Sequence, residues 1–577
     1  MDTGLQNEIW AKKLIDAFIA QDIDYFCCGP GSRSTTLSLA IANHPKAKWT
    51  VHFDERGTCF HALGYGKAAK KPAVVMATSG TAIGNLLPAI MEASNDQIPL
   101  IILSADRPPE LRDCGANQTV DQVKLFNNFV RWQTDLPCPD DCLSDRYLAS
   151  TISHAVMMAS FPPAGPVHIN CMFREPLFSH PETAFLSTCV HVDQANLHPS
   201  EEAIDDWVEK LSTHRNGIIV VGSSSSDLTD AVFPLAEKLK WPIFADILSS
   251  LRSSDHPSLI THFDPILKMK NSTVIDAVIQ FGNRIVSKTL AQWLEKQTLE
   301  FYLHACEHPV RQDPMHIVTH RVLGSPSIFT RKLGSVLESK NEQEWLDQWS
   351  EWDRNCKQKL IELFSVSKEL TEPNLIWEIA SFLSEDWNLF LANSMPVRDA
   401  NQFFLPSSRS GPIFGNRGVS GIDGNIATAC GLAQGNGKAT LAVIGDLTFL
   451  HDLNSLVLLN KSEQPVVICV VNNGGGGIFS FLPVSKRKEA FEEFIVASHG
   501  LSFEAAGKLF DLPYFHPKTS AEFRKLLHAQ EKNPHSCIIE ITTDRIENVR
   551  IHEQIIKAIG TCLSSANSPL EIPATLH

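Results

Sequence analysis

Two positions near the carboxyl end of the chain place oxygen ligands at the ends of predicted strands. In LAVIGD, residues 441–446, a strand-like run ends at Asp446, and the residues that follow have apolar side chains at helical spacing. The next predicted strand, PVVICVV, ends immediately before Asn472 and Asn473. Because a right-handed crossover returns a chain to the same edge of a parallel sheet, we expect Asp446 and Asn473 to converge if their strands are neighbours.

These residue types suit a hard metal ion. A carboxylate, an amide oxygen and a free glycine carbonyl are ligands for Mg²⁺, which commonly shares its coordination sphere with phosphates. The stretch NNGGGG, residues 472–477, also offers backbone amides that could bind phosphate oxygens. A simpler interpretation stays open for each part, with Asp446 as a helix cap and NNGGGG as a tight turn. Their occurrence together across one crossover favours a metal and phosphate site.

The elements that would position these residues belong to an α/β fold. Short β-branched runs alternate with helical patterns from end to end, which predicts parallel sheets. At 577 residues the chain is too long for one core. We expect three α/β domains, at residues 1–185, 186–355 and 356–577. The predicted strands are DYFCC, WTVHF, AVVMAT, PLIILSA and PVHIN, then GIIVVG, PIFADI, DAVIQFG and EFYLHA, then WNLFLANS, ATLAVIGD, PVVICVV and SCIIEIT.

Two further patterns concern the relation between these domains. The Trp-rich helical stretch 341–364 is expected to act as a connector. The outer domains share an order of helix, strand and small-residue loop, with CGPGSRS in one and ANSMPVR in the other. This shared order indicates related folds.

Composition argues against several classes of protein. The net charge is -15 and no dense run of Lys and Arg is present, so nucleic acid is not an expected partner. The amino-terminal stretch lacks the pattern of a signal peptide, and no uncharged apolar stretch reaches the roughly 18 to 20 residues of a membrane span, which predicts a cytoplasmic protein. The fourteen cysteines lack paired zinc spacing and are expected to be reduced. GxxxxGK[ST] is absent, and CGPGSRS lacks the third glycine of a dinucleotide fingerprint.

The GD and NN pairs resemble the metal and diphosphate motif of thiamine-diphosphate enzymes, a family whose three-domain α/β plan is similar to that predicted above. The resemblance implies Mg²⁺, or Mn²⁺ in its place, held by Asp446, Asn473 and the carbonyl of Gly475. It also implies that Glu55, in VHFDERGTCF, hydrogen-bonds the aminopyrimidine ring of thiamine diphosphate and serves in acid–base catalysis. The other implied cofactor contacts are Ser394, Ile422, Gly445, Leu447, Thr448, Ile478 and Phe479.

Glu55 has a simpler interpretation as a charge resting on a helix N-terminus. The helix predicted after it is rich in small residues, which would let another helix approach closely, as at a subunit interface. These are Gly57, Ala62, Gly64, Gly66 and Ala68.

Longer stretches, including CGPGSRSTTL, SADRPPELRDCGANQTVDQ, NSMPVRDA and NRGVSGIDG, resemble one branch of that family. Its members decarboxylate 2-oxoglutarate and add the resulting four-carbon unit to isochorismate in menaquinone biosynthesis. Both substrates are polyanionic, and the planar fork of arginine suits carboxylates. The resemblance assigns Ser394, Arg398 and Arg417 to 2-oxoglutarate, and Ser32, Arg33, Arg107, Asn117, Gln118 and Lys288 to isochorismate.

Some of these assignments have alternatives. Thr289 stands beside Lys288 where a second basic residue can occur, and Lys288 or any one arginine could instead be a solvated surface charge. The resemblance implies at least a homodimer, with a homotetramer as the family expectation and each site formed between the first domain of one protomer and the third domain of another. The alternative functions are another thiamine-diphosphate 2-oxoacid decarboxylase or carboligase, or a catalytically silent scaffold. A nicotinamide oxidoreductase is less well supported, since its fingerprint is missing.

Overall fold

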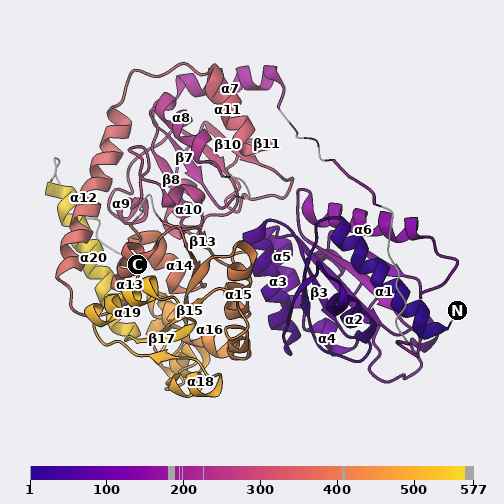
Figure 1. Ribbon diagram of the computed structural model, residues 1–577. Helices are drawn as coiled ribbons and strands as arrows, with labels where there is room; N and C mark the ends of the chain where they lie inside the picture. Colours follow the sequence, from indigo (N-terminus) through magenta and orange to yellow (C-terminus); the bar gives the residue numbers. More distant parts are fainter. Residues whose placement is uncertain are drawn as a thin grey trace.

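Three parallel β-sheets follow one another along the chain, each covered by helices (Figure 1). The computed structural model describes residues 2–179, 189–193, 195, 197, 199–224, 227–405 and 410–565. Every strand predicted from the sequence is present, so the expected α/β class with three parallel sheets is confirmed. The predicted boundary at 185 lies outside the described residues, and the boundary at 355 falls inside one continuous helix; both boundaries stay predictions.

The first sheet has six strands in the order β2-β1-β3-β4-β6-β5. Its strands are β1 (Tyr25–Cys28), β2 (Lys48–Val51), β3 (Ala73–Ala77), β4 (Leu100–Asp106), β5 (Trp132–Leu136) and β6 (Pro166–Met172). Its helices are α1 (Thr3–Ala20), α2 (Thr35–Asn43), α3 (Glu55–Ala69), α4 (Thr81–Gly84), α5 (Leu87–Asp96) and α6 (Asp145–Ser160). The edge strand β5 escaped prediction because WQTDL is half-buried and lacks a β-branched run.

The middle sheet has five strands in the order β11-β10-β9-β7-β8. These are β7 (Gly217–Val221), β8 (Ile243–Ala245), β9 (Ala277–Phe281), β10 (Phe301–Cys306) and β11 (His320–Leu323). Its helices are α7 (Glu201–Thr213), α8 (Thr229–Leu239), α9 (Phe263–Met269), α10 (Lys288–Glu295) and α11 (Pro326–Val336). The predicted connector is the helix α12 (Glu344–Val366), which packs against α9 and α20.

The third sheet has six strands in the order β13-β12-β14-β15-β17-β16. These are β12 (Trp387–Leu391), β13 (Ile413–Phe414), β14 (Ala439–Gly445), β15 (Val466–Asn472), β16 (Tyr514–Phe515) and β17 (Cys537–Thr542). Its longer helices are α13 (Glu372–Phe382), α14 (Met395–Phe403), α15 (Asn425–Asn436), α19 (Ser520–Lys532) and α20 (Arg545–Ser565). Counted in chain order, the strands of the first and third sheets have the same arrangement, as the shared loop pattern indicated.

The first and third domains meet through two helices rich in small residues, α3 and α15 (Figure 1). A Cβ added to Gly64 would lie 2.1 Å from the carbonyl oxygen of Thr428, and one added to Gly431 would lie 2.0 Å from that of His61. Gly64 of α3 therefore serves a close contact within the chain, and the subunit interface suggested by the sequence stays a prediction. Within the described residues, no helix is both long enough and apolar enough to cross a bilayer.

Candidate functional site

The carboxyl ends of β14 and β15 lie side by side at one edge of the third sheet. The two strands are parallel neighbours, and Gly445 pairs with Val471 at their last shared position. Asp446 begins the short helix α16 (Asp446–His451), and Asn473 directly follows β15. The predicted convergence of Asp446 and Asn473 is therefore confirmed.

The Asp446 carboxylate organises the glycine-rich loop. Its Oδ2 accepts hydrogen bonds from the backbone N–H of Gly475 at 2.8 Å and of Asn473 at 3.1 Å. Its Oδ1 accepts one from the N–H of Leu447 at 2.6 Å. The residue is only 1% exposed. One buried carboxylate thus joins the start of α16 to the loop after β15.

Asn473 presents an oxygen that has no hydrogen-bond partner. Its Nδ2 donates to Oε1 of Glu372 at 3.0 Å, while its Oδ1 is buried and unsatisfied. A buried acceptor without a partner costs free energy unless a ligand satisfies it. The carbonyl oxygen of Gly475 accepts a hydrogen bond from the N–H of Gly477 at 2.9 Å. Together with Asp446 and this carbonyl, the Asn473 oxygen fits a hard cation.

The donor set explains why side-chain clusters alone do not reveal the site. Among the described residues, no group of three or more His, Cys, Asp and Glu side chains could hold a metal ion. The candidate set has one carboxylate, one amide and one backbone carbonyl. Such a set suits Mg²⁺, which keeps several water or phosphate ligands of its own.

Two of the four glycines need their conformational freedom. Gly474 has φ +78° and Gly475 has φ +144°, both in the left-handed region. A Cβ on Gly475 would also lie 2.5 Å from the carbonyl oxygen of Val496. The turn interpretation is therefore compatible with the ligand interpretation, because this turn brings backbone amides to Asp446. Ile478 and Phe479 follow in a short 3₁₀ turn, Gly477–Phe481, and are half-buried.

A buried acidic cluster that the sequence did not reveal lies behind Asn473. Glu372, at the start of α13, also accepts a hydrogen bond from Oγ1 of Thr543 at 3.0 Å. Burial, followed by the nearby charge of Asp399, raises the pKa of Glu372 to about 7. Asp399 in turn contacts Nε2 of His552 at 2.8 Å. No local pattern around Glu372 predicts this role, because Asn473, Thr543 and Asp399 come from three other parts of the chain.

His499 is a second residue that the sequence did not single out. Its Nε2 lies 3.2 Å from Oδ2 of Asp446, and the side chain is largely buried. It follows no predicted strand and belongs to no recognised motif, so only the folded chain brings it to the carboxylate.

Two predicted substrate arginines lie together near this edge. Arg398 Nη1 donates to the carbonyl oxygen of Ser394 at 2.6 Å, and Arg417 Nη1 donates to Oδ1 of Asn393. Burial lowers the pKa of both guanidinium groups, and their mutual repulsion lowers that of Arg398 further. Ser394 has φ +73°, which turns the chain sharply between β12 and α14. Two partly desolvated cations that repel one another suit a dianionic ligand.

The loop that carries Arg417 is held by the other two domains. Glu92 of α5 accepts hydrogen bonds from the N–H groups of Gly418 at 2.8 Å and Val419 at 2.7 Å. Arg284 of the middle domain donates to the carbonyl oxygen of Gly418 at 2.8 Å. Beyond this point Ile422 is 37% exposed, which leaves its side chain free to contact a ligand.

Two more predicted arginines converge in the first domain. Arg33 donates to the carbonyl oxygen of Phe173 at 3.0 Å and to Oε1 of Glu175 at 2.7 Å. Arg107 donates to the carbonyl oxygen of Gln118 at 2.7 Å and to Oγ of Ser79. Burial, and then the nearby Arg33, lower the pKa of Arg107.

The remaining predicted residues are more exposed. Glu55, at the first position of α3, is half-buried, and its Oε2 accepts from Nδ2 of Asn85 at 3.3 Å. Ser32 and Asn117 are exposed on loops of the first domain, and Lys288 is exposed at the start of α10. The single chain thus assembles three groups: the Asp446 edge, the Arg398 and Arg417 pair, and the Arg33 and Arg107 pair.

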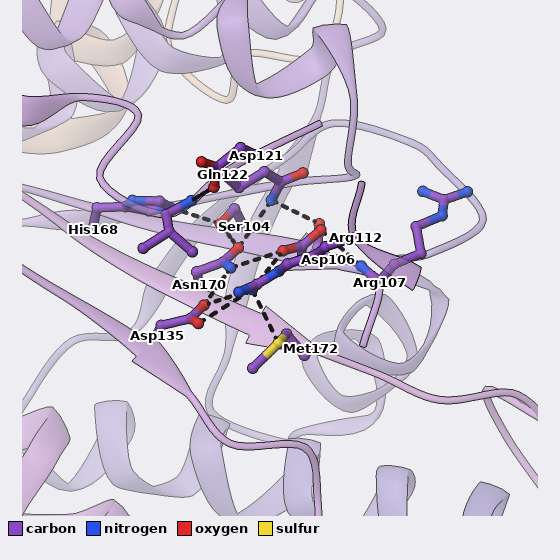
Figure 2. A network of polar contacts seen from close by, with 12 residues as sticks. Ser104, Asp106, Arg107, Arg112, Asp121, Gln122, Asp135, His168, Asn170 and Met172 are labelled. Atoms are coloured by element: carbon purple, nitrogen blue, oxygen red, sulfur yellow. Dashed lines mark hydrogen bonds and ion pairs between the residues drawn. The ribbon is translucent and has the colours of Figure 1, made fainter. Parts of the chain in front are cut away.

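An ion-pair network lies under the loop that carries Arg107 (Figure 2). Arg112 Nη2 lies 3.2 Å from Oδ2 of Asp106 and 3.1 Å from Oδ1 of Asp135. Asn170 Nδ2 donates to the same two carboxylates, at 3.0 and 2.6 Å. No local sequence pattern predicts this network, since its members come from β4, β5, β6 and a loop.

Comparisons with known proteins agree with this geometry. Residues 10–125 match the family described as "Thiamine pyrophosphate enzyme, N-terminal TPP binding domain", and residues 394–541 match the corresponding C-terminal TPP binding domain. Residues 186–391 match the middle domain of thiamine pyrophosphate enzymes. Benzoylformate decarboxylase from Polynucleobacter necessarius has the same fold, with a TM-score of 0.74 and 14% identity over 93% of this chain and 98% of that one.

Much closer relatives come from curated sequences. The 2-succinyl-5-enolpyruvyl-6-hydroxy-3-cyclohexene-1-carboxylate synthase of Salinibacter ruber is 38% identical, over 96% of this chain and 97% of its own. The synthase of the same name from Rubrobacter xylanophilus is 37% identical, over 96% and 99%. The chain therefore belongs to the 2-succinyl-5-enolpyruvyl-6-hydroxy-3-cyclohexene-1-carboxylate synthase family of thiamine-diphosphate enzymes.

Proposed function

We propose that this protein is a transferase that decarboxylates 2-oxoglutarate and adds the four-carbon unit to isochorismate, a step of menaquinone biosynthesis. The observation that carries the proposal is the Asp446 edge, where a buried carboxylate and an unsatisfied amide oxygen of Asn473 meet a loop of glycine amides. The full-length similarity to synthases of this reaction supports the choice of substrates.

The third domain would hold the cofactor. Asp446, Asn473 and the carbonyl of Gly475 would bind Mg²⁺, with Mn²⁺ able to replace it, and the adjacent amides would receive the diphosphate. When bound, thiamine diphosphate supplies the carbon nucleophile of the reaction. The protein's part is to orient and enclose it, with contacts from Ser394, Ile422, Gly445, Leu447, Thr448, Ile478 and Phe479.

Glu55 would act from the first domain of a second protomer. Its carboxylate would hydrogen-bond the aminopyrimidine ring and serve in acid–base catalysis. This role requires Glu55 to face the third domain of another chain. An exposed apolar row on β2 and just after it supports a covered surface here: Trp49 is 53% exposed, Val51 36% and Phe53 56%. We therefore propose a homodimer or homotetramer. We also propose that the protein acts in the cytoplasm.

The arginine pairs would divide the two substrates. Arg398 and Arg417, with Ser394, would bind the carboxylates of 2-oxoglutarate. Isochorismate would be held by the first-domain group and by the middle domain. Its proposed ligands are Ser32, Arg33, Arg107, Asn117, Gln118 and Lys288.

The test is an assay with both substrates, Mg²⁺ and thiamine diphosphate. We expect 2-oxoglutarate and isochorismate to disappear in equal amounts, with one CO₂ released per turnover. Reactions with pyruvate in place of 2-oxoglutarate, or without isochorismate, serve as controls. Equal CO₂ release without isochorismate would show a simple decarboxylase, and absence of cofactor binding would show a silent scaffold.

A further inference from the structure

Arg112 lies in the middle of the segment that carries three of the proposed isochorismate ligands, Arg107, Asn117 and Gln118. Its guanidinium points away from the segment and into the sheet, where it contacts Asp106, Asp135 and the sulfur of Met172 (Figure 2). All three partners lie on β4, β5 and β6. One side chain therefore fastens an irregular loop to three neighbouring strands.

The charges in this network depend on one another. Asp106 is fully buried, and Asn170 donates to it and to Asp135, which places two carboxylates around one amide. Asp135 is partly exposed, but a carboxylate this close to the buried Asp106 still repels it unless a cation lies between them. Arg112 supplies that cation, and its pKa is raised by the hydrogen bond and charge of Asp135, despite burial that lowers it.

The Asp106 carboxylate also holds the backbone of Arg107, the first of the proposed ligands. Asp106 Oδ1 accepts the backbone N–H of Arg107 at 2.8 Å, and the Arg107 side chain extends away from the network (Figure 2). Arg107 Nη1 then donates to the carbonyl oxygen of Gln118, whose Nε2 donates to the carbonyl oxygen of Ser79 at 3.0 Å. A continuous series of contacts runs from Arg112 to both proposed ligands.

Gln122 anchors the far end of the segment. Its Nε2 donates to Oδ1 of Asn170 at 2.9 Å, and its Oε1 accepts from the N–H of Gly80 at 3.3 Å. Asn170 thus contacts Asp106, where the loop begins, and Gln122 at its far end, so one residue of β6 holds both ends of the loop.

We propose that Arg112 is a positioning residue for isochorismate: it sets the place of Arg107 and Gln118 without touching the substrate. This inference rests on the proposed function. Because Arg112 acts only on the acceptor side, its loss should raise the KM for isochorismate and spare the decarboxylation of 2-oxoglutarate. Misplacing a binding group by about 1 Å can cost on the order of 10²-fold.

The experiment compares Arg112→Lys and Arg112→Met with the wild-type protein. Lysine keeps the charge but loses the planar fork. We expect the KM for isochorismate to rise about tenfold in Arg112→Lys and more in Arg112→Met. Decarboxylation of 2-oxoglutarate without isochorismate, followed by reduction of an artificial dye, should stay within about twofold.

Arg174→Met is the matched control. Arg174 pairs with Glu110 of the same segment at 2.6 Å, but both side chains are about half exposed. An exposed pair contributes little, so both activities of this variant should be near those of the wild type.

A double variant separates the effect on substrate binding from an effect on folding. Arg112→Met with Asp135→Asn removes one of the two carboxylates that the single change leaves uncompensated, while the fork stays absent, so its KM for isochorismate should remain high. A wild-type KM in any folded Arg112 variant would overturn the inference, as would a parallel loss of dye reduction. If the wild-type protein itself fails to use isochorismate, the proposed function fails instead.

Discussion

The first and third sheets share one strand order, but the aspartate at the carboxyl end of a central strand is stabilised differently in each. In the first sheet, Asp106 at the end of β4 is paired with an internal cation, Arg112. In the third sheet, Asp446 follows β14 and is held by backbone amides and approached by His499. No guanidinium or ammonium group among the described residues forms an ion pair with it.

The difference assigns a separate task to each edge. An edge closed by its own arginine has no need of a metal ion and can fix a loop in place. An edge that keeps a carboxylate and the unsatisfied Oδ1 of Asn473 is suited to accept a cation from solution. One topology would thus support the proposed substrate loop in one domain and the proposed metal and phosphate site in the other.

The largest expected effect concerns Glu55, the first-domain residue proposed to contact the cofactor. Glu55→Gln keeps the size of the side chain but removes the carboxylate needed for proton transfer. We expect turnover to fall on the order of 10² to 10⁴-fold, while thiamine diphosphate still binds. Steady-state rates measured beside a cofactor titration check this. Turnover close to that of the wild type would remove Glu55 from the catalytic assignment.

The next effect compares the two edges directly, without metal or cofactor. Arg112→Met leaves Asp106 buried and unpaired, and we expect a loss of about 3 kcal/mol in the free energy of unfolding. Asp446→Asn removes a buried charge that no arginine or lysine among the described residues pairs, but its NH₂ group replaces one of the two accepting oxygens, so its loss should be smaller, about 1 to 2 kcal/mol. Denaturant unfolding of the apoprotein gives both values. Equal losses would mean that the two edges are not neutralised differently.

A smaller effect should come from Glu372, which holds the amide of Asn473. Glu372→Leu removes the acceptor, so the amide can turn its nitrogen toward the metal position, and Mn²⁺ affinity should fall about 10- to 100-fold. Electron paramagnetic resonance of free Mn²⁺ with thiamine diphosphate present measures this. Thr543→Val removes the other hydrogen bond to the same carboxylate oxygen and should bind Mn²⁺ normally. Unchanged affinity in folded Glu372→Leu would exclude this orienting role.

The last effect, the smallest for any single residue, separates the domains by pH. Burial lowers the pKa of His61 to about 3, and those of His52 and His168 to about 4. They stay neutral in the folded first domain and become charged when it unfolds below pH about 6.5. Their stabilising effect is therefore present above pH 6.5 and is lost as the pH falls towards 4.

The opposite slope is expected in the third domain. Burial lowers the pKa of His552, but Asp399 outweighs it and the net shift is upward, so its stabilising effect is lost as the pH rises. Hydrogen exchange at pH 5 and 7.5 resolves the domains. We expect first-domain amides to lose protection at pH 5, on the order of 1 to 2 kcal/mol per histidine. Equal protection in that domain at both pH values would contradict the assignment.

The sequence predicted the edge of the third sheet well because its signals are local. A β-branched strand followed by Asp446, and another followed by Asn473, place two candidate ligands without knowledge of any distant contact. The short strands β13 and β16 were missed, since two residues show no periodicity. Helical spacing after Asp446 predicted one helix, but α16 ends at His451 and a separate 3₁₀ segment covers Leu453–Leu458.

Residues that act through other residues could not be predicted from the sequence. Arg112, Glu372 and His499 gain their roles from partners on separate strands and helices, so no local pattern marks them. The family resemblance supplied Glu55 and the substrate arginines, and their roles remain predictions for experiment. The packing of α3 against α15 likewise needed the folded chain, because small residues predict a close approach but not its partner.

The central claim is that the third sheet takes its cation from solution through Asp446. Thermal unfolding of the wild-type protein and of Asp446→Asn, each with and without Mg²⁺ plus thiamine diphosphate, tests it most directly. Ligands at about 100 times their dissociation constant should stabilise the wild type by about 2.7 kcal/mol, and the variant by little or nothing. Equal stabilisation of the two proteins would contradict the claim.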